Sequence, residues 1–427
     1  MRTAAHVTGV AHTIRPMSND LMNGIRILEV AEHTFVPLAS AILADWGAEV
    51  IKIEHPERGD AMRGLAQVGT LGFGTDVQVL VENSNRGKRS LGLDLTDPDG
   101  LAILHRLIAQ SDVFLTNKLP YVCEKLHITV DEVREHNPDI VYVRGSGYGV
   151  RGPDVNAGGY DFLGFWGRSG VADTMRAKHL PLPPTQPAPA FGDNLGASMI
   201  AGGIATALLD RARTGRTHVV DVSLLAAGMW ALGGAIAISQ QTGEPWNQQP
   251  HEGDIATPSN PIVGTYRTSD DRFIVFSALQ GFHYWPEFCD RLGLPEYATD
   301  PRFASDPDTF MANAPIAARL VWDTISSRPL AHWREAFAGM KAQWAVAQDS
   351  LEVASDPQSL ANDYVQDCVT HDGKPYRVVA TPVQFDEEAA PAKRGPAFNE
   401  HGDAILVDDL GLDWDTVIDL KVRGVVA

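Results

Sequence analysis

The stretch GIRILEVAEHTFVPLASAILADWGAEVIKIEHP, residues 24–56, decides the fold of this chain. It begins with a short apolar segment, passes through a helical stretch, and returns to a second apolar segment, AEVIKIE, at residues 48–54. Short runs rich in Ile, Leu and Val that are bounded by polar residues or Gly are typical of buried strands. The stretch is therefore predicted to be a βαβ unit.

The same alternation continues toward the C-terminus. Further strands are predicted at RSLGLDL (89–95), DVFLTN (112–117) and DIVYVRGSG (139–147), with helices at residues 98–110 and 130–136 between them. Strands that alternate with helices form a parallel sheet with helices on both faces. We therefore expect an α/β fold with a doubly wound, Rossmann-like parallel sheet.

The rest of the chain extends this domain and adds a smaller one. A Pro-rich connection, PLPPTQPAPAFGD (181–193), leads into a long helix of small residues that ends near Gly215, and an Ala/Gly-rich helix is predicted near residues 225–240. From residue 260 two short strands and several helices indicate an α+β domain. The expected division is a tail (1–23), a large Rossmann-like α/β domain (24–225), a linker helix (226–259), a small α+β domain (260–340) and a return segment that completes the large domain (341–427).

Composition excludes several classes of protein. The chain has 427 residues, of which 44% are hydrophobic and 21% charged, and no apolar run approaches the roughly 20 residues that span a bilayer. The net charge of −19 argues against binding nucleic acid, which needs a basic face. Three Cys without a CxxC pair, and no apolar segment of a signal peptide, lead us to expect a cytoplasmic protein with no membrane partner.

Nucleotide and metal signatures are also missing. The segment VAEHTFVP (30–37) lacks GxGxxG, and GSGYG (145–149) is better interpreted as a tight turn at the end of a strand. No GxxxxGK[ST] motif or cysteine-based zinc motif occurs. We therefore expect no metal, nicotinamide or flavin.

Two features could carry chemistry. Asp193 lies between the Pro-rich loop and the small-residue helix, where helix N–H groups would keep a carboxylate ionised and able to attack a thioester, although Asp is also a common helix cap. The segment NSNRGKRSLGLDL (83–95) places Arg86, Lys88 and Arg89 together in an acidic chain. This basic cluster could face phosphates or be a solvated run of charge.

Together these segments resemble the family III CoA-transferases, which include formyl-CoA and carnitine CoA-transferases, and the related α-methylacyl-CoA racemases. The resemblance runs from about Gly24 through nearly the whole chain. It is carried by LADWGAEVIKIEHPERGD, NSNRGKRSLGLDL, NPDIVYVRGSGYGVRGP with its following GGYD, FGDNLGASM and GPAFNEHGDAIL. It implies an interlocked homodimer that moves CoA from an acyl-CoA donor to a carboxylic acid acceptor, through an aspartyl mixed anhydride and an aspartyl-CoA thioester.

The resemblance also assigns residues. Asp193 corresponds to the acylated nucleophile, and the CoA contacts would be Thr34, His55, Leu93, Thr96, Asn117 and Lys125. His55 stands where the family often has Arg, and Thr96 where it often has Lys. The phosphates would then be held more weakly, or by Arg89 or another neighbour.

Tyr160, Asp161 and Gln280 mark a departure from the racemase branch. That branch uses a His immediately before an Asp, together with a Glu in the small domain, to remove and return an α-proton. Here Tyr160 precedes Asp161, and Gln280 takes the place of the Glu, so these residues are assigned to the substrate pocket. A transferase is favoured; a racemase-like isomerase and a non-catalytic acyl-CoA-binding homologue are the alternatives.

Overall fold

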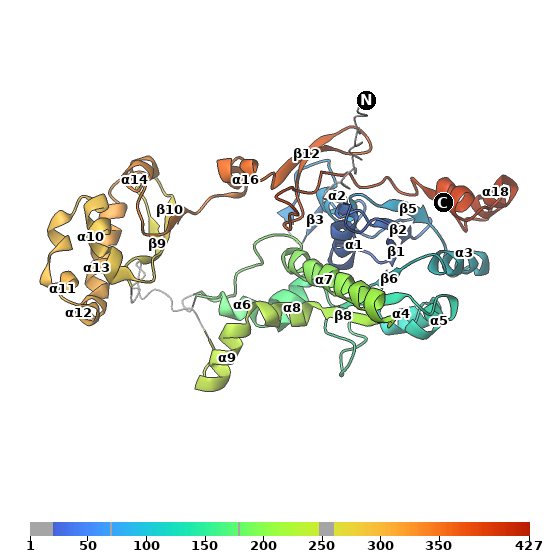
Figure 1. The fold of residues 1–427 in the computed structure, drawn as a ribbon, viewed down its shortest axis with the longest axis horizontal. Coiled ribbons are helices and arrows are strands. Elements are labelled where there is room, and N and C mark those ends of the chain that lie inside the picture. The colour runs from blue at the N-terminus through green and yellow to red at the C-terminus, as the bar shows by residue number, and fades with distance from the viewer. Residues whose placement is uncertain (1–19, 69–70, 178–179, 247–259) are drawn as a thin grey trace, which may run out of the picture. The chain divides into compact units, whose positions relative to one another are not determined.

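A computed structural model describes residues 20–68, 71–177, 180–246 and 260–427. The chain divides into two compact units (Figure 1). The larger unit holds the described residues up to Arg176, then Leu182–Trp246 and Pro357–Ala427, and the smaller unit holds mainly the described part of 247–356. Most of the expected N-terminal tail, and residues 247–259 of the expected linker, lie outside the described residues.

A six-stranded parallel sheet forms the centre of the larger unit. Its order is β5-β2-β1-β6-β7-β8, and each neighbouring pair is parallel. The chain moves outward from β1 in one direction and then crosses back to β6, so the direction of winding changes between β1 and β6. This is the point at which open α/β sheets bind ligands. The strands are β1 (Arg26–Val30), β2 (Glu49–Glu54), β5 (Arg89–Gly92), β6 (Val113–Thr116), β7 (Val141–Ser146) and β8 (Val219–Ser223).

Helices cover both faces of this sheet, as the alternation of strands and helices predicted. Ile27 packs in one buried cluster with α1 and α7, whereas its neighbour Leu28 packs in a second cluster with α3 and α18, because successive strand residues point to opposite faces. The first face carries α1 (Phe35–Asp45), α7 (Phe191–Thr214) and α8 (Leu224–Ala231). The second carries α3 (Pro98–Ile108), α5 (Val130–His136), η3 (Ile405–Asp409) and α18 (Trp414–Val422).

Local sequence signals explain where several of these helices begin. The Asp97 side chain accepts a hydrogen bond from the backbone N–H of Asp99, and Pro98 occupies the first turn of α3. Thr129 and Glu132 form a capping box at the start of α5. These caps satisfy backbone N–H groups that a helix leaves without partners.

Small residues in α7 allow it to pack closely on α1. A methyl group added at Gly196 would overlap the Phe35 ring. Ala197 and Ala201 are also buried on this helix. The small residues of α7 therefore allow α1 and α7 to pack closely within the larger unit.

The Ala/Gly-rich helix expected at residues 225–240 is two helices. α8 ends at Ala231 and α9 spans Gly233–Thr242, with Leu232 between them in a non-helical conformation. Gly233 and Gly234 follow directly, and Gly favours a helix less than other residues except Pro. Further elements of the larger unit are β3 (Gln67–Val68), β4 (Leu71–Gly72), α2 (Val79–Asn85), α4 (Pro120–Lys125), η1 (Phe162–Arg168), α6 (Val171–Thr174), α16 (Pro357–Ala361), β12 (Val365–Val369), β13 (Pro375–Val379) and α17 (Gly402–Ala404).

The smaller unit has its own aromatic core. Trp285, Phe288 and Phe337 are buried against an antiparallel sheet of order β11-β10-β9. β11 lies beyond the boundary expected at residue 340 and pairs with β10. Its elements are β9 (Val263–Arg267), β10 (Phe273–Ser277), α10 (Gly281–Leu292), η2 (Pro295–Ala298), α11 (Pro301–Ala304), α12 (Pro307–Ala312), α13 (Ala314–Ile325), α14 (Leu330–Ala336), β11 (Trp344–Val346) and α15 (Ser350–Val353).

No helix in the described part of either unit combines the length and the apolar character that crossing a bilayer requires.

Candidate active site

Two cavities lie where the strands of the parallel sheet end. The first, which we call the strand-end cavity, has a volume of about 490 Å³ and is lined by residues that follow β1, β2, β5 and β6. The second, the Asp193 cavity, has a volume of about 620 Å³ and contains Asp193. Glu32, Lys118 and Val122 line both cavities. The two cavities therefore adjoin at the point between β1 and β6 where a ligand is expected.

The strand-end cavity brings together His55, Leu93, Thr96 and Lys125, four of the six expected CoA contacts. The His55 Nδ1 atom accepts a hydrogen bond of 3.2 Å from the backbone N–H of Glu57, so the other ring nitrogen carries the proton of the neutral ring. The Thr96 hydroxyl donates to Asp94 at 2.7 Å. Of these residues, Lys125 supplies a permanent positive charge.

Arg58 is a second permanent charge in this cavity, and sequence reasoning missed it. Neither Arg58 nor Lys125 has an ion pair with another described residue, and both are exposed. Of the four acidic residues that line the cavity, Glu32 pairs with Lys118, Glu54 with Arg63 and Asp60 with Lys52, and Asp94 accepts from the Thr96 hydroxyl. The sequence HPERGD contained a signal for Arg58, because only two residues separate it from His55, the position at which the family often has Arg.

The basic cluster of residues 86–89 does not line either cavity. Arg86 is buried and paired with Asp45, and Lys88 is buried and paired with Glu29. Arg89 pairs with Glu49 and Asp409. Arg89 lines neither cavity because of the direction of its strand. It begins β5, whereas ligands bind beyond the carboxyl ends of parallel strands.

Asn117 joins the two turns beside the cavities, and Thr34 lies in one of them. Asn117 lines the Asp193 cavity, but its amide accepts from the Glu32 N–H at 3.2 Å and donates to the Glu32 carbonyl at 2.6 Å. This ties the turn after β6 to the turn after β1. Thr34 precedes α1, is fully buried, and lines neither cavity; its hydroxyl has no hydrogen-bond partner among the described residues.

Asp193 lies in the first turn of α7, which begins three residues earlier than expected. The helix starts at Phe191, after Ala190 in a left-handed conformation, so Asp193 is the third helical residue rather than its cap. A methyl at Gly192 would overlap both Phe165 and Asp161. Gly192 therefore permits the close contact that sets the start of this helix.

The Asp161 side chain, although distant in sequence, caps the start of α7, which is the role that was expected for Asp193. Its buried carboxylate accepts hydrogen bonds of 3.1 and 3.2 Å from the backbone N–H of Gly192. The Asp193 carboxylate has no hydrogen bond or ion pair within the described residues. Burial and the neighbouring Asp161 carboxylate raise the pKa of Asp193 to about 8. The expectation that the helix start keeps Asp193 ionised therefore does not hold for the free protein.

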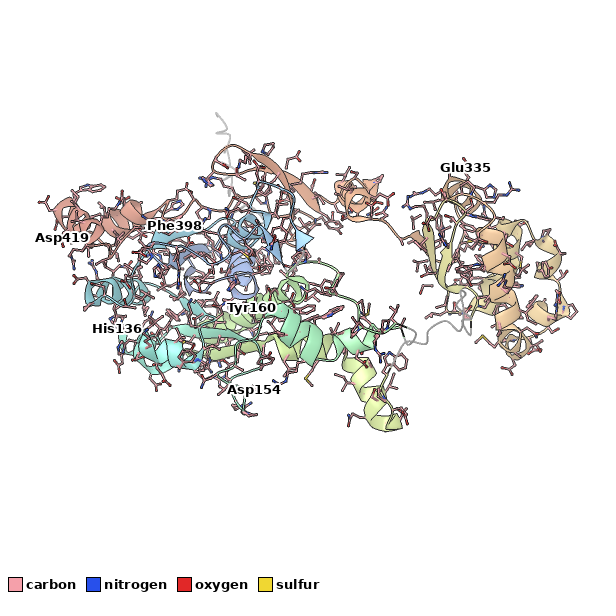
Figure 2. The ribbon with its side chains drawn as sticks, turned by 180° about the vertical axis from the view of Figure 1, so that it is seen from behind. His136, Asp154, Tyr160, Glu335, Phe398 and Asp419 are labelled. Atoms are coloured by element: carbon pink, nitrogen blue, oxygen red, sulfur yellow. The ribbon has the colours of Figure 1, made fainter. Side chains whose placement is uncertain are left out.

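Tyr160 and His33 face each other in the Asp193 cavity. Their rings meet edge to face, with centroids 5.3 Å apart, and Tyr160 is 62% exposed. Figure 2 shows Tyr160 within the larger unit, on the loop that also carries Asp154. Gln280 belongs to the smaller unit, where it precedes α10. The structure thus places Tyr160 and Asp161 in the wall of the Asp193 cavity, and Gln280 in neither cavity of the larger unit.

In the described part of the chain, no group of three or more His, Cys, Asp or Glu side chains is arranged to hold a metal ion.

Comparisons with known proteins connect this geometry to a family. Residues 22–402 match CoA-transferase family III. The (R)-2-hydroxy-4-methylpentanoate CoA-transferase of Clostridioides difficile is 27% identical over 95% of this chain and 99% of its own length. An alpha-methylacyl-CoA racemase of Mus musculus is 29% identical over 75% of this chain and 76% of its own.

Solved structures give the same result. A CAIB/BAIF family protein from Brucella suis superposes with a TM-score of 0.77 at 26% identity, covering 91% of this chain and 98% of that protein. The fold, the two cavities and the match over residues 22–402 are consistent with one another. The chain belongs to CoA-transferase family III.

Proposed function

We propose that this protein transfers CoA from an acyl-CoA to a carboxylic acid, with Asp193 as the residue that is transiently acylated. The observation that carries the proposal is the Asp193 carboxylate, which lines a cavity without a hydrogen-bond or ion-pair partner among the described residues. A carboxylate held for structure alone would be expected to have such partners. An unpartnered carboxylate in a cavity is suited to attack a substrate.

The adjoining cavities support the assignment of the two ends of the substrate. Arg58 and Lys125 in the strand-end cavity would bind the phosphates of CoA. The pantetheine arm would then pass the Glu32–Lys118 ion pair, which lines both cavities, and bring the thioester toward Asp193. His55, Leu93 and Thr96 would line the path of the nucleotide end.

The reaction would proceed through Asp193 in balanced steps. Its carboxylate attacks the donor carbonyl, CoA thiolate leaves, and an aspartyl acyl anhydride forms. The thiolate attacks the aspartyl carbonyl, which releases the first acid and leaves an aspartyl-CoA thioester. The acceptor carboxylate attacks this thioester, and the thiolate then takes the new acyl group from the second anhydride. Each step exchanges one activated carbonyl for another, so no ATP is consumed.

A donor and acceptor screen tests this function. Purified protein is incubated with pairs of acyl-CoA and free carboxylic acid, and the new thioesters are identified by mass spectrometry. We expect CoA transfer for at least one pair, and a covalent acyl or CoA adduct on the protein during turnover. A protein that binds acyl-CoA but forms neither adduct nor product would be the non-catalytic homologue.

The racemase alternative can be tested in the same reactions run in heavy water. Relatives include a racemase, but the position before Asp161 is Tyr160, and a neutral phenol with a reference pKa of about 10 is a poor base. We therefore expect CoA transfer to be much faster than exchange of the α-proton. Rapid deuterium uptake into a 2-methylacyl-CoA would contradict the transferase proposal.

Activity should depend on the protonation of Asp193. The carboxyl must lose its proton before it attacks, and its pKa is raised to about 8. We expect kcat/KM to rise with pH on the acid side of its profile as Asp193 loses this proton. Asp161→Asn removes the neighbouring negative charge but keeps an oxygen that can accept from Gly192, so the rise should move to lower pH.

The control for this prediction is Asp367→Asn, which removes an exposed carboxylate on β12. It should leave the pH profile unchanged. If Asp161→Asn also leaves the profile in place, the charge of Asp161 does not set the protonation of Asp193.

Arg58→Ala and Lys125→Ala should each raise KM for acyl-CoA about 3- to 10-fold, because each removes one charge-assisted contact to a phosphate. The contact is remote from the thioester and binds ground state and transition state alike, so kcat should stay within a few-fold. Steady-state kinetics at two salt concentrations measures both values. Lys421→Ala, at the end of α18, is the control. A collapse of kcat at unchanged KM would place either residue in the chemistry.

The interlocked homodimer implied by the resemblance also remains a proposal. In its support, α9 has no buried residue, and Trp230 on α8 is 79% exposed. Large exposed apolar side chains that lie together mark interaction surfaces. We expect size-exclusion chromatography with light scattering to give a mass near 92 kDa, twice about 46.2 kDa. A stable monomer at micromolar concentration would contradict the proposal.

A further inference from the structure

His33 combines backbone strain with a free imidazole in the Asp193 cavity. It has φ of 69°, a left-handed conformation that is uncommon for residues other than Gly. It occupies the turn between β1 and α1, where the strands change their direction of winding. Strained residues of this kind persist where the surroundings hold them firmly, and they concentrate at functional sites.

The surroundings of His33 do hold it firmly. Its backbone N–H donates to the Asp60 carboxylate at 3.0 Å, and Asp60 is paired with the buried ammonium of Lys52 at 2.8 Å. The ring is held on its other side by the edge contact with Tyr160. Within the described residues neither ring nitrogen of His33 has a hydrogen-bond partner. The backbone is fixed while the imidazole nitrogens remain available to a ligand.

The position of His33 relative to the proposed substrate indicates which atom it would meet. It follows Glu32, which lines both cavities, and itself lines only the Asp193 cavity. A pantetheine arm that enters past Glu32 would bring its sulfur to this turn before the carbonyl reaches Asp193. Protonation would help the sulfur to leave, because an alkyl thiol such as Cys has a reference pKa of about 8.5, so its thiolate is a poorer leaving group than an ordinary carboxylate.

We propose that His33 is a catalytic residue that protonates and deprotonates the CoA sulfur; this inference rests on the proposed function of Asp193. As the Asp193 oxygen bonds to the thioester carbonyl carbon, the carbon–sulfur bond breaks and its electron pair passes to sulfur. The His33 imidazolium gives its proton to that sulfur, which leaves neutral CoA thiol and neutral imidazole. When the sulfur attacks the anhydride, the imidazole takes the proton back and a carboxylate is released. The same exchange serves the acceptor half of the reaction.

Two variants separate this role from a structural one. His33→Gly removes the imidazole and suits the left-handed backbone, so folding should be retained. His33→Asn keeps a polar side chain that tolerates this conformation but cannot transfer a proton. Tyr160→Phe keeps the ring contact with His33 and removes the hydroxyl, so it tests whether Tyr160 supplies the proton instead.

The experiment compares two donors of the same acid: its CoA thioester and its S-(4-nitrophenyl) thioester, whose thiolate leaves without a proton. For both His33 variants, we expect acylation of Asp193 by acyl-CoA to fall at least about 100-fold, the usual size of general acid catalysis. Acylation by the aryl thioester should fall less than about threefold. Added imidazole should restore part of the acyl-CoA rate in His33→Gly.

The outcomes are distinct. Equal losses with both donors, or no loss with either, would overturn the role of His33. A loss in Tyr160→Phe that depends on the donor, with none in the His33 variants, would also overturn it and assign the proton to Tyr160. If the unaltered protein is acylated by neither donor, the proposed function of Asp193 fails instead.

Discussion

Asp193→Asn is expected to lower CoA transfer by at least about a thousandfold, equivalent to roughly 4 kcal/mol of activation free energy. Asparagine has nearly the same size but cannot form the acyl anhydride. In the unaltered protein, hydroxylamine added during turnover should trap the activated aspartyl carbonyl, and peptide mapping should find the modification on the peptide that contains Asp193. The variant should show no modification there.

The matched control is Asp210→Asn, which changes another Asp of α7 that pairs with Arg216 and His218. It should retain most of the activity. If Asp193→Asn transfers CoA normally, or if trapping marks another residue, Asp193 is not the nucleophile.

A stability measurement separates loss of chemistry from loss of fold in Asp193→Asn. The pKa of Asp193 is raised from an ordinary 3.8 to about 8 in the folded protein. The unfolded chain therefore loses this proton first, and the unaltered protein loses stability as pH rises between these two values. The variant lacks this loss, so its melting temperature should rise relative to the unaltered protein between pH 4 and pH 8. A variant that is less stable at every pH would indicate damage to the fold.

The parallel sheet could be predicted from sequence because its signal is local. Each strand is a short apolar run next to a helix, and the sheet order follows from the rules for such units. The break between α8 and α9 at Leu232 was missed, although Gly233 and Gly234 follow it, because Gly within a helical pattern is often tolerated. Boundaries of this kind are decided by packing more than by propensity.

The site was predicted less completely, because sequence gives the type of charge but not its partner. Arg89 was predicted as a phosphate contact and Arg58 was not, yet Arg89 is paired with Glu49 and Asp409 at the start of β5. Arg58 follows the end of β2 and lines the strand-end cavity. The capping of α7 by Asp161 had no sequence signal either, because it joins Asp161 to Gly192, 31 positions later.

A network of buried charges was not predicted either, because the sequence does not show which charged side chains pair with one another. Lys52 and Lys88 both pair with Glu29, at 2.8 and 2.7 Å, and all three side chains are fully buried. Lys52 also pairs with Asp60, whose other carboxylate oxygen accepts from the His33 N–H. Burial alone would raise the pKa of Asp60, but the Lys52 charge and the His33 N–H outweigh it and lower the pKa to about 2. The network thus links the core to the turn that carries His33.

Lys52→Met should destabilise the larger unit by about 3–5 kcal/mol, the usual cost of removing one partner from a buried ion pair. The methionine fills a similar volume, so the loss arises from charge: Glu29 and Asp60 would share only Lys88 in a buried site. Denaturant unfolding should show a lower midpoint with an unchanged slope. Lys421→Met, at the partly exposed end of α18, should change stability by less than about 1 kcal/mol.

A second substitution tests whether the unpaired charge is the cause. Asp60→Asn in the Lys52→Met background removes one of the two carboxylates that lost their partner, while the asparagine oxygen can still accept from the His33 N–H. The double variant should therefore be more stable than the sum of the single losses predicts, by about 0.5–3 kcal/mol, the range found for residues in contact. Strictly additive losses would mean that Lys52 and Asp60 act independently, and that the network does not connect the core to the His33 turn.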